Sequence, residues 1–515
     1  SGLVLQAWVV WAQMRYAGDL MHAWSCRIVN GYFKRPYEWF LSKHTSELSA
    51  TAINEVNQVI YHAVLPLLII ASNALVVLFV FAFLVFVDPV LAFTTLVVLG
   101  GAYGITYRVL RKKLTQAGEE WVVANKGRHH VLTEAFSGIK QVKVSHAEQV
   151  FESKFSRVCR TMCDAMVRSR VMGQVPSFAM QALLFGGMIL VVLYSVATRD
   201  GFAAGLPLLG LYAFAGYKMM PALQRIFVQL AEMEFSSTAL ISLRTPLQMG
   251  EEPGRHALVE DTTVVERIPL REAFGFRDVS YQYPGNEEPT LHSINLTIPA
   301  GAKVGIVGPT GSGKTTIVDL ILGLLRPTSG AVVVDGQTIS DDTLRGWQAS
   351  VGYVPQTIFL ADTTIAGNIA FGIPPDRVDR GRVEAVAKLA NLHEFVANQL
   401  PQGYDTPTGE RGVRLSGGQR QRVGIARALY HDPDAVVLDE ATSALDNATE
   451  RLVMQAMDRL TPTKTAIMIA HRLSTVRTCD VIFFLEGGRV TAQGTFEERR
   501  ASHPSFRSLT EAEAR

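Results

Sequence analysis

The chain has 515 residues, of which 48% are hydrophobic and 19% charged, and its formal net charge is +2. This length exceeds what one hydrophobic core usually supports, so at least two domains are expected. The near-neutral charge argues against a nucleic-acid partner, which usually requires a basic face. The four cysteines lack the paired spacing of a zinc site and are expected to be reduced. The chain starts at Ser1 inside an apolar run, which predicts that an N-terminal piece is missing.

The first half of the chain predicts membrane-spanning helices. No charged residue occurs between Val171 and Thr198, and only Asp88 occurs between His62 and Tyr107. A helix crosses a bilayer with about 20 apolar residues, so the second stretch should hold two spans separated at Asp88-Pro89. The candidate spans are 1–24, 62–86, 90–109, 176–198 and 206–231. One further span before Ser1 would give six.

Basic residues predict which loops face the cytoplasm. They gather after the first and third spans, at Arg27, Lys34, Arg35, Lys43, Arg108, Arg111, Lys112, Lys113, Lys126, Arg128, Lys140 and Lys143. Residues 108–175 should continue as helices below the membrane and turn at Ser137–Gly138. Arg15 and Asp19 are four residues apart and should form an ion pair.

The composition changes near residue 245. Residues 1–245 form the predicted helical transmembrane domain, and residues 246–272, which are polar and contain three prolines, are expected to be a linker. From residue 273 to 515, short β-type runs alternate with helical segments, which predicts an α/β domain.

A phosphate-binding loop is the most specific motif of the α/β domain. The apolar strand Val304–Val307 runs into a G-x-x-x-x-G-K-[ST] sequence formed by Gly308, Pro309, Thr310, Gly311, Ser312, Gly313, Lys314 and Thr315, with Thr316 following. The glycines let successive backbone N–H groups point at phosphate oxygens, and the helix that follows presents its positive N-terminus. Lys314 is expected to reach the β- and γ-phosphates of ATP, and Thr315 to bind Mg²⁺.

A second apolar strand, Ala435–Leu438, ends in two acidic residues. Asp439 at its tip is predicted to hold Mg²⁺, directly or through water, and Glu440 to act as the general base on the attacking water. An apolar run that ends in an acid is common by itself. Together with the phosphate-binding loop it indicates nucleotide hydrolysis.

The segment Leu415–Gln419 precedes a basic helix and includes Ser416, Gly417 and Gly418. Two glycines before a helix predict a second anion-binding N-terminus, although a flexible loop is the alternative. One nucleotide cannot reach both this segment and the phosphate-binding loop of its own domain, unless a second chain supplies one of them.

Taken together, these motifs resemble the nucleotide-binding domain of ABC transporters over residues 274–500. By this resemblance, Leu415–Gln419 is the signature segment and Gln356 is the glutamine that senses Mg²⁺. The resemblance also implies that His471 contacts the γ-phosphate and that Tyr283 stacks on adenine. Residues 443–446 resemble the D-loop, and residues 409–412 resemble the exporter-specific segment before the signature. The resemblance implies an active ATPase that works as a head-to-tail dimer, with a second copy of the chain or a related half-transporter.

The order of the two halves resembles ABC exporters. By this resemblance, Pro36–Phe40 and Ser137–Lys140 are the two turns that contact the ATPase domains. Pro36–Phe40 with Ser46–Leu48, Tyr217–Ile226 and Ile358–Gly372 look closest to bacterial lipid-linked oligosaccharide flippases of the PglK type. That resemblance implies an inner-membrane flippase with its ATPase domain in the cytoplasm. Multidrug and lipid A exporters are the alternative, and a soluble ABC ATPase of DNA repair or translation is the rival from another class.

Lys218 and Arg225 are candidate substrate residues. They are seven residues apart in the last span, so they share one helix face. A cation within a membrane is costly and should face the bundle interior or water. The functional hypothesis is that they bind an anionic headgroup. The alternative is that Lys218 pairs with an acid or caps a kink at Pro221 while Arg225 lies near the membrane boundary.

Overall fold

The computed structural model describes residues 2–87, 89–197, 202–249, 266–409, 412–439, 463–470 and 476–513. The chain forms two compact units. One contains residues 1–35 and 39–257, and the other contains residues 36–38 and 258–515.

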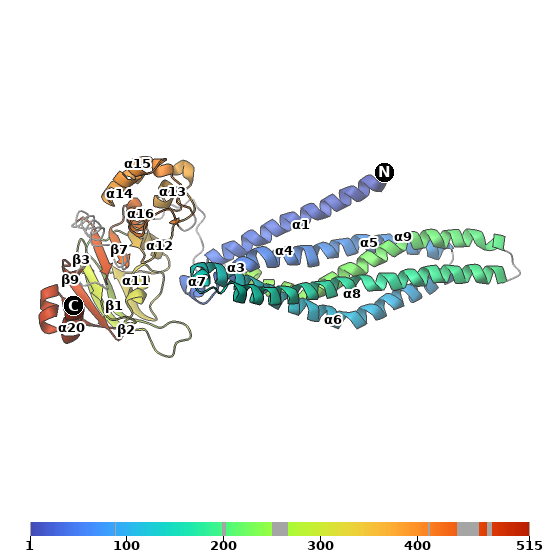
Figure 1. Cartoon of the computed structure of the whole chain (residues 1–515), viewed down its shortest axis with the longest axis horizontal. Coiled ribbons are helices and arrows are strands. Elements are labelled where there is room, and N and C mark those ends of the chain that lie inside the picture. Colours follow the sequence, from blue (N-terminus) through green and yellow to red (C-terminus); the bar gives the residue numbers. More distant parts are fainter. Residues whose placement is uncertain are drawn as a thin grey trace. The chain divides into compact units, whose positions relative to one another are not determined.

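Every secondary-structure element described for the first unit is a helix (Figure 1). Its elements are α1 (Gly2–Phe33), α2 (Tyr37–Leu41), α3 (Thr45–Ala50), η1 (Thr51–Glu55), α4 (Val56–Val59), η2 (Ile60–Val64), α5 (Leu65–Val87), α6 (Pro89–Ser137), α7 (Ile139–Val144), α8 (Glu148–Ala197), α9 (Phe202–Phe235) and α10 (Ser237–Met249). The elements η1 and η2 are π-helical turns within one continuous helical stretch.

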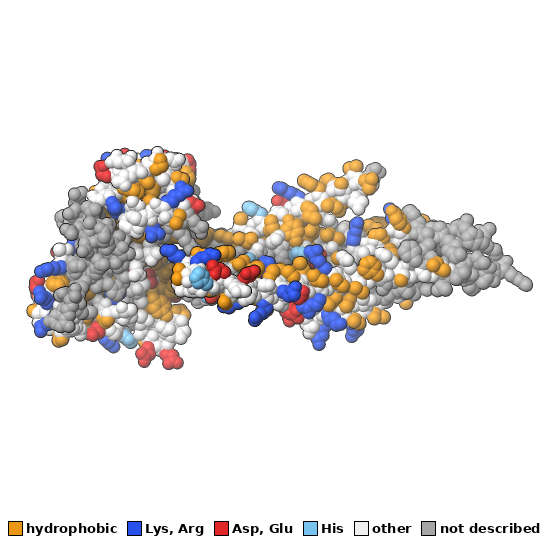
Figure 2. All heavy atoms as spheres, viewed as in Figure 1, with side chains coloured by type: hydrophobic (Ala, Val, Ile, Leu, Met, Phe, Trp, Pro, Cys, Tyr) orange, Lys and Arg blue, Asp and Glu red, His pale blue; other side chains and the backbone are white. Residues whose placement is uncertain are grey.

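Large apolar side chains cover much of this unit's surface, as Figure 2 shows. Phe79 and Phe86, for example, are 71% and 91% exposed. Within the described residues, one helical stretch, Glu47–Val87, is long and apolar enough to cross a membrane by length and composition. Such exposure in water would be unfavourable, so this surface suits a lipid environment.

The predicted breaks between helices are present. Helix α5 ends at Val87 and α6 begins at Pro89, where a proline is tolerated because the first helical N–H needs no partner. Helix α6 continues to Ser137, beyond its apolar part, and α7 and α8 follow, as predicted for residues 108–175. The Arg15–Asp19 ion pair is also confirmed, with Nε and Oδ2 3.2 Å apart. The four cysteines, all among the described residues, form no disulfide bond.

Charged and polar contacts join the C-terminal end of α9 to α6 and η2. Glu234 on α9 accepts hydrogen bonds from three residues of α6: Tyr107 Oη at 3.1 Å, Arg111 Nε at 3.1 Å and Thr115 Oγ1 at 2.8 Å. His62 Nδ1 in η2 lies 3.0 Å from Glu232 Oε1. These contacts fix the end of α9 against its neighbours.

The second unit is an α/β fold, as predicted. Its strands are β1 (Ala273–Tyr281), β2 (Leu291–Pro299), β3 (Lys303–Val307), β4 (Ser329–Val334), β5 (Gln337–Thr338), β6 (Val351–Val354), β7 (Ala435–Asp439), β8 (Thr465–Ile469), β9 (Val481–Glu486) and β10 (Arg489–Gly494). Its described helices are α11 (Lys314–Ile321), α12 (Leu344–Gln348), α13 (Ile365–Ile369), η3 (Pro375–Arg377), α14 (Arg380–Leu389), α15 (His393–Gln399), η4 (Gly403–Asp405), α16 (Gly417–Tyr430), α19 (Phe496–Ser502) and α20 (Pro504–Glu513).

Two sheets organise this unit. An antiparallel sheet has the order β2-β1-β4-β5, and a six-stranded sheet has the order β10-β9-β3-β8-β7-β6. Neighbouring strands from β9 to β6 run parallel. The carboxyl ends of β3, β8 and β7 therefore lie along one edge, which is where ligands bind in open α/β sheets.

The core lies on both faces of the six-stranded sheet. On β7, Val436 and Leu438 pack with the helical side that includes α13, α14 and α16, while Ala435 and Val437 pack with the antiparallel sheet and α11. Side chains alternate between the faces of a strand, so burial on both faces requires the continuous apolar run that the sequence has. All five residues of β7 are buried.

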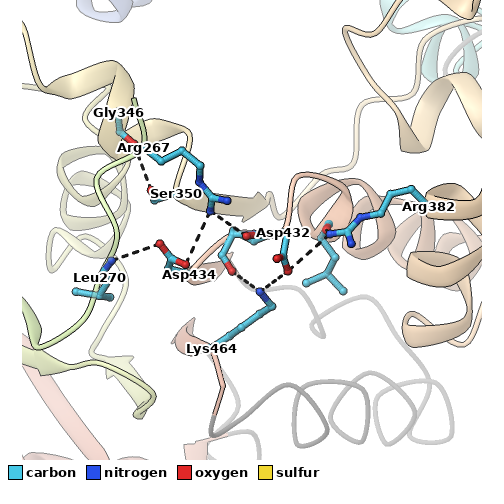
Figure 3. Close-up of polar contacts among 10 residues, drawn as sticks. Arg267, Leu270, Gly346, Ser350, Arg382, Asp432, Asp434 and Lys464 are labelled. Carbon is cyan, nitrogen blue, oxygen red and sulfur yellow. Dashed lines mark hydrogen bonds and ion pairs between the residues drawn. The ribbon is translucent and has the colours of Figure 1, made fainter. Parts of the chain in front are cut away.

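The segment before β1 is fixed to this unit by a polar junction (Figure 3). Arg267 donates to the Asp432 carbonyl oxygen at 2.9 Å, and the Leu270 N–H donates to Asp434 Oδ2 at 3.3 Å. Asp432 also lies 2.7 Å from Lys464 Nζ and 3.6 Å from an Arg382 guanidinium nitrogen. The Lys464 ammonium, which hydrogen-bonds to the carboxylate, lowers the Asp432 pKa despite partial burial.

The structure therefore differs from the prediction that residues 246–272 are linker throughout. Helix α10 continues to Met249 with Pro246 inside it. Residues 266–272 belong to the second unit, and Leu270 within them is 8% exposed. Composition missed this because the position of residues 266–272 depends on contacts to residues distant in sequence, such as Asp432 and Asp434, rather than on local polarity.

Candidate nucleotide-binding site

The predicted phosphate-binding loop joins β3 to α11 at the edge of the six-stranded sheet. Gly311 and Gly313 have φ angles of +79° and +100°. Residues with a Cβ rarely adopt such angles, so the loop's curl depends on these glycines. Helix α11 then begins at Lys314, and its N-terminus faces the loop.

The side chain of Lys314 folds back over the loop. Its Nζ donates to the carbonyl oxygens of Gly308 at 2.8 Å and Pro309 at 3.0 Å. Ser312 Oγ is buried and has no hydrogen-bond partner within the described structure. A buried hydroxyl without a partner is costly, so a cation and an unsatisfied hydroxyl beside a glycine-rich loop suit an anionic ligand.

The aromatic residue predicted to stack on adenine lies beside the start of α11. The Tyr283 hydroxyl is 3.2 Å from Thr316 Oγ1, and the Tyr283 ring packs edge-on against Tyr281 with centroids 4.9 Å apart. The Tyr283 side chain therefore lies beside the first turn of the helix that follows the phosphate-binding loop.

The acidic side of the site lies at the carboxyl end of β7. Asp439 is 9% exposed, and the Tyr353 hydroxyl on β6 donates to its Oδ2 at 3.4 Å. Burial, followed by repulsion from Asp439, raises the pKa of Asp319 on α11 to about 6. The Thr315 side chain is exposed at the start of the same helix.

These donors fit a magnesium ion held partly by a nucleotide. Hydroxyl and carboxylate oxygens are the ligands that Mg²⁺ prefers, and in nucleotide sites it takes only one or two of them from protein. Within the described residues, no cluster of three His, Cys, Asp or Glu side chains is arranged for a metal. Thr315 and Asp439 stay the predicted hydroxyl and carboxylate ligands, and Gln356 is the third residue predicted at the metal.

Several predicted residues lie outside the described part of the chain. They are Glu440, His471 and the segment 443–446. Gln356 is described, and its exposed side chain follows the end of β6 at Val354 by two residues.

The segment Leu415–Gln419 forms the start of α16. Ser416 is the N-cap, and its Oγ accepts from the Gln419 N–H at 3.2 Å while Gln419 Oε1 accepts from the Ser416 N–H at 2.8 Å. This capping box orders the turn but leaves the hydroxyl proton of Ser416 available as a donor. Ser416 and Gly417 are exposed, so an anion from outside the domain can approach this helix terminus.

Sequence reasoning missed Arg427, which anchors α16. Its guanidinium donates to the Asn368 and Phe359 carbonyl oxygens, each at 2.8 Å, and lies 4.8 Å from the Phe371 ring centre. Burial lowers its pKa. An arginine within the otherwise apolar run Val423–Leu429 was the available signal, because a half-buried cation requires acceptors.

The candidate substrate residues are on α9. Lys218 and Arg225 are both exposed, and within the described residues neither forms an ion pair. Lys218 Nζ lies 5.8 Å from the centre of the Tyr217 ring. The described structure therefore shows no acid paired with Lys218.

Two segments of the chain match known protein families. Residues 2–202 match the ABC transporter transmembrane region and residues 291–443 match the ABC transporter family. The chain is 32% identical over 479 residues to an ATP-dependent lipid A-core flippase of Burkholderia orbicola, covering 90% of this chain and 77% of that protein. This chain belongs to the ABC transporter family.

Within that family it is a half-transporter, with a helical transmembrane region fused to an ATPase domain. A lipid A-core flippase of Alkalilimnicola ehrlichii is 29% identical over 507 residues, which is 97% of this chain and 83% of that protein. The structure of a bacterial Atm1-family ABC exporter with ATP bound matches with a TM-score of 0.81 and 27% identity, covering 98% of this chain and 86% of that one.

Membership of the ABC transporter family settles several of the expectations drawn from the sequence. The ABC half-transporter binds ATP, couples ATP hydrolysis to transport and resides in a membrane. The rival prediction of a soluble ABC ATPase is wrong, because the transmembrane region is part of the same chain. The relatives support a lipid flippase or exporter, but they do not support the narrower PglK-type assignment.

Proposed function

We propose that this half-transporter is a flippase for an amphipathic glycolipid whose headgroup carries phosphate, driven by ATP bound between two chains. The observation that carries the proposal is its similarity along most of its length to lipid A-core flippases. Lipid A-type glycolipids and polyprenyl-pyrophosphate glycans share this chemistry of sugar, phosphate and long apolar chain. Both therefore remain within the proposal.

Lys218 and Arg225 are the proposed headgroup residues. Seven residues correspond to about two turns of helix, so both side chains project from one face of α9. Both are exposed, and cations in a span are otherwise costly. A phosphate bound between them would compensate both charges through charge-assisted hydrogen bonds.

In the ATPase domain, we assign roles by position. Lys314 and the loop N–H groups would bind the phosphates, and Tyr283 would stack on the adenine. Thr315 and Asp439 would hold Mg²⁺, which when bound would neutralise charge on the phosphates. Glu440 would accept a proton from the attacking water, and His471 and Gln356 would contact the γ-phosphate side of the site.

The capped start of α16 supports an arrangement of the site across two chains. Its exposed Ser416 hydroxyl and Gly417 N–H can donate to a phosphate that another chain holds. The partner is a second copy or a related half-transporter. Closure around ATP would then move the attached helices and switch access across a bacterial inner membrane, with the ATPase domains in the cytoplasm.

Reconstitution of the full-length protein in liposomes tests the substrate. ATPase stimulation and flipping are measured with a lipid A-core glycolipid, a polyprenyl-pyrophosphate glycan, the dephosphorylated form of each, and a hydrophobic drug. We expect stimulation by a phosphorylated glycolipid and none by its dephosphorylated form. Equal stimulation by the dephosphorylated lipids, or stimulation by the drug alone, would overturn the proposal.

A further inference from the structure

Tyr353 connects the strand that leads to Gln356 with the acidic end of the neighbouring strand. On β6, Tyr353 lies in parallel register with Val437 of β7. Asp439 is two residues beyond Val437, so it projects from the same face of β7 as Val437 does. This register allows the Tyr353 hydroxyl to donate to Asp439 Oδ2 at 3.4 Å.

The carboxylate of Asp439 is in a setting where such a donor matters. Its residue is 9% exposed, and Asp319, also 9% exposed, brings a second carboxyl group near it from α11. Two acids in a poorly hydrated space repel each other, so the orientation of each carboxylate depends on its neighbouring donors. The Tyr353 hydroxyl, on a residue held in the sheet by pairing with β7, can restrain the orientation of Asp439.

We propose that Tyr353 is a positioning residue for the ATPase reaction, which holds the Asp439 carboxylate in the orientation that binds Mg²⁺. This inference rests on the proposed role of Asp439 as a magnesium ligand. Groups that hydrogen-bond to a metal ligand typically change metal affinity by about 10- to 100-fold. Tyr353 would act through Asp439 and would not touch the ion or the nucleotide.

The test separates metal affinity from nucleotide affinity in the full chain, purified in detergent. Binding of a non-hydrolysable ATP analogue is titrated with Mg²⁺, and binding is also measured in EDTA. Tyr353→Phe keeps the ring and removes only the hydroxyl. We expect it to raise the Mg²⁺ midpoint about tenfold and to leave binding in EDTA unchanged.

Three controls complete the design. Tyr404→Phe removes a hydroxyl that lies 2.9 Å from His393 Nδ1, and it should leave the Mg²⁺ midpoint unchanged. Asp439→Asn should raise the midpoint at least as far as Tyr353→Phe does. Adding Tyr353→Phe to Asp439→Asn should have no further effect, because the hydroxyl acts through that carboxylate.

The outcomes are distinguishable. If Asp439→Asn raises the midpoint and Tyr353→Phe does not, the inference about Tyr353 is wrong while the proposed magnesium site stands. The inference is also wrong if the two effects add in the double variant, or if Tyr353→Phe weakens binding equally in EDTA. If Asp439→Asn itself leaves the midpoint unchanged, the proposed magnesium role of Asp439 is wrong.

Discussion

A Cβ atom on Gly118 would overlap the backbone carbonyl oxygen of Phe235. Gly118 is in the middle of α6 and Phe235 is the last residue of α9. The backbone of α9 therefore occupies the space that a side chain at position 118 of α6 would need. The nearby Trp121 ring packs on Phe235 with centroids 6.1 Å apart. Close approach through a small residue is how membrane-protein helices commonly pack.

Gly118→Ala should destabilise the helical unit, because the new methyl group meets backbone atoms that cannot move aside. Overpacking of this kind costs about 1–3 kcal/mol. Thermal unfolding in detergent, followed by tryptophan fluorescence, measures the effect. Gly104→Ala on the same helix is the matched control: its Cβ would meet nothing within 4 Å, and it should be neutral or slightly stabilising. An unchanged melting temperature for Gly118→Ala would contradict the close packing.

Asp319→Asn should stabilise the metal-free protein above neutral pH. Burial and repulsion from Asp439 raise the Asp319 pKa from 3.8 to about 6, so the ionised form is disfavoured in the folded state. The stability that Asp319 contributes is therefore fully present below pH 3.8 and is lost as pH rises through 6. The variant should gain about 1–3 kcal/mol at pH 8 and about half as much at pH 5.

Unfolding temperatures in EDTA at several pH values measure this difference. EDTA is needed because a bound cation would favour the ionised carboxylate. A gain that is constant from pH 5 to pH 8 would show that Asp319 does not titrate as described.

Lys218→Ala combined with Arg225→Ala should reduce flipping of the phosphorylated glycolipid while basal ATPase activity survives. Hydrogen bonds to a charged group contribute about 1.5–3 kcal/mol each, so a loss of about tenfold or more is expected. Lys112→Ala with Lys113→Ala removes two exposed cations from α6 and controls for net charge. Unimpaired flipping by the α9 double variant would rule out this headgroup site.

Glu440→Gln should lower ATP turnover by about 10²–10⁴-fold, because it removes the proposed general base. ATP-dependent stabilisation against heat should persist, since the amide keeps the shape of the carboxylate. Glu384→Gln, at a carboxylate that lies 2.7 Å from Lys388 Nζ, should leave turnover unchanged. If turnover of Glu440→Gln equals that of the unmodified chain, another group acts as the base.

Local sequence patterns were sufficient for much of this protein. The helix break before Pro89, the long helices around Ser137 and the loop from Gly308 to Lys314 are consequences of short-range chemistry: proline geometry, apolar length and glycine conformation. The spans of the first unit beyond Glu47–Val87, and the roles of Glu440 and His471, stay predictions.

Other features required partners from distant parts of the chain. The packing of Gly118 on Phe235, the contact of Tyr353 with Asp439 and the anchoring of Arg427 on Phe359 join residues far apart in sequence. The amino-acid composition likewise did not predict that α10 continues to Met249 or that Arg267 bonds to Asp432.

The sequence by itself determined the protein class, a membrane transporter with an ATPase domain. Phosphate binding and membrane crossing each require a contiguous pattern of residue types, and such patterns are visible in the sequence. Tertiary structure decided which buried charges are compensated and where helices can touch, because those depend on the strand register and the crossing of elements that no local pattern specifies.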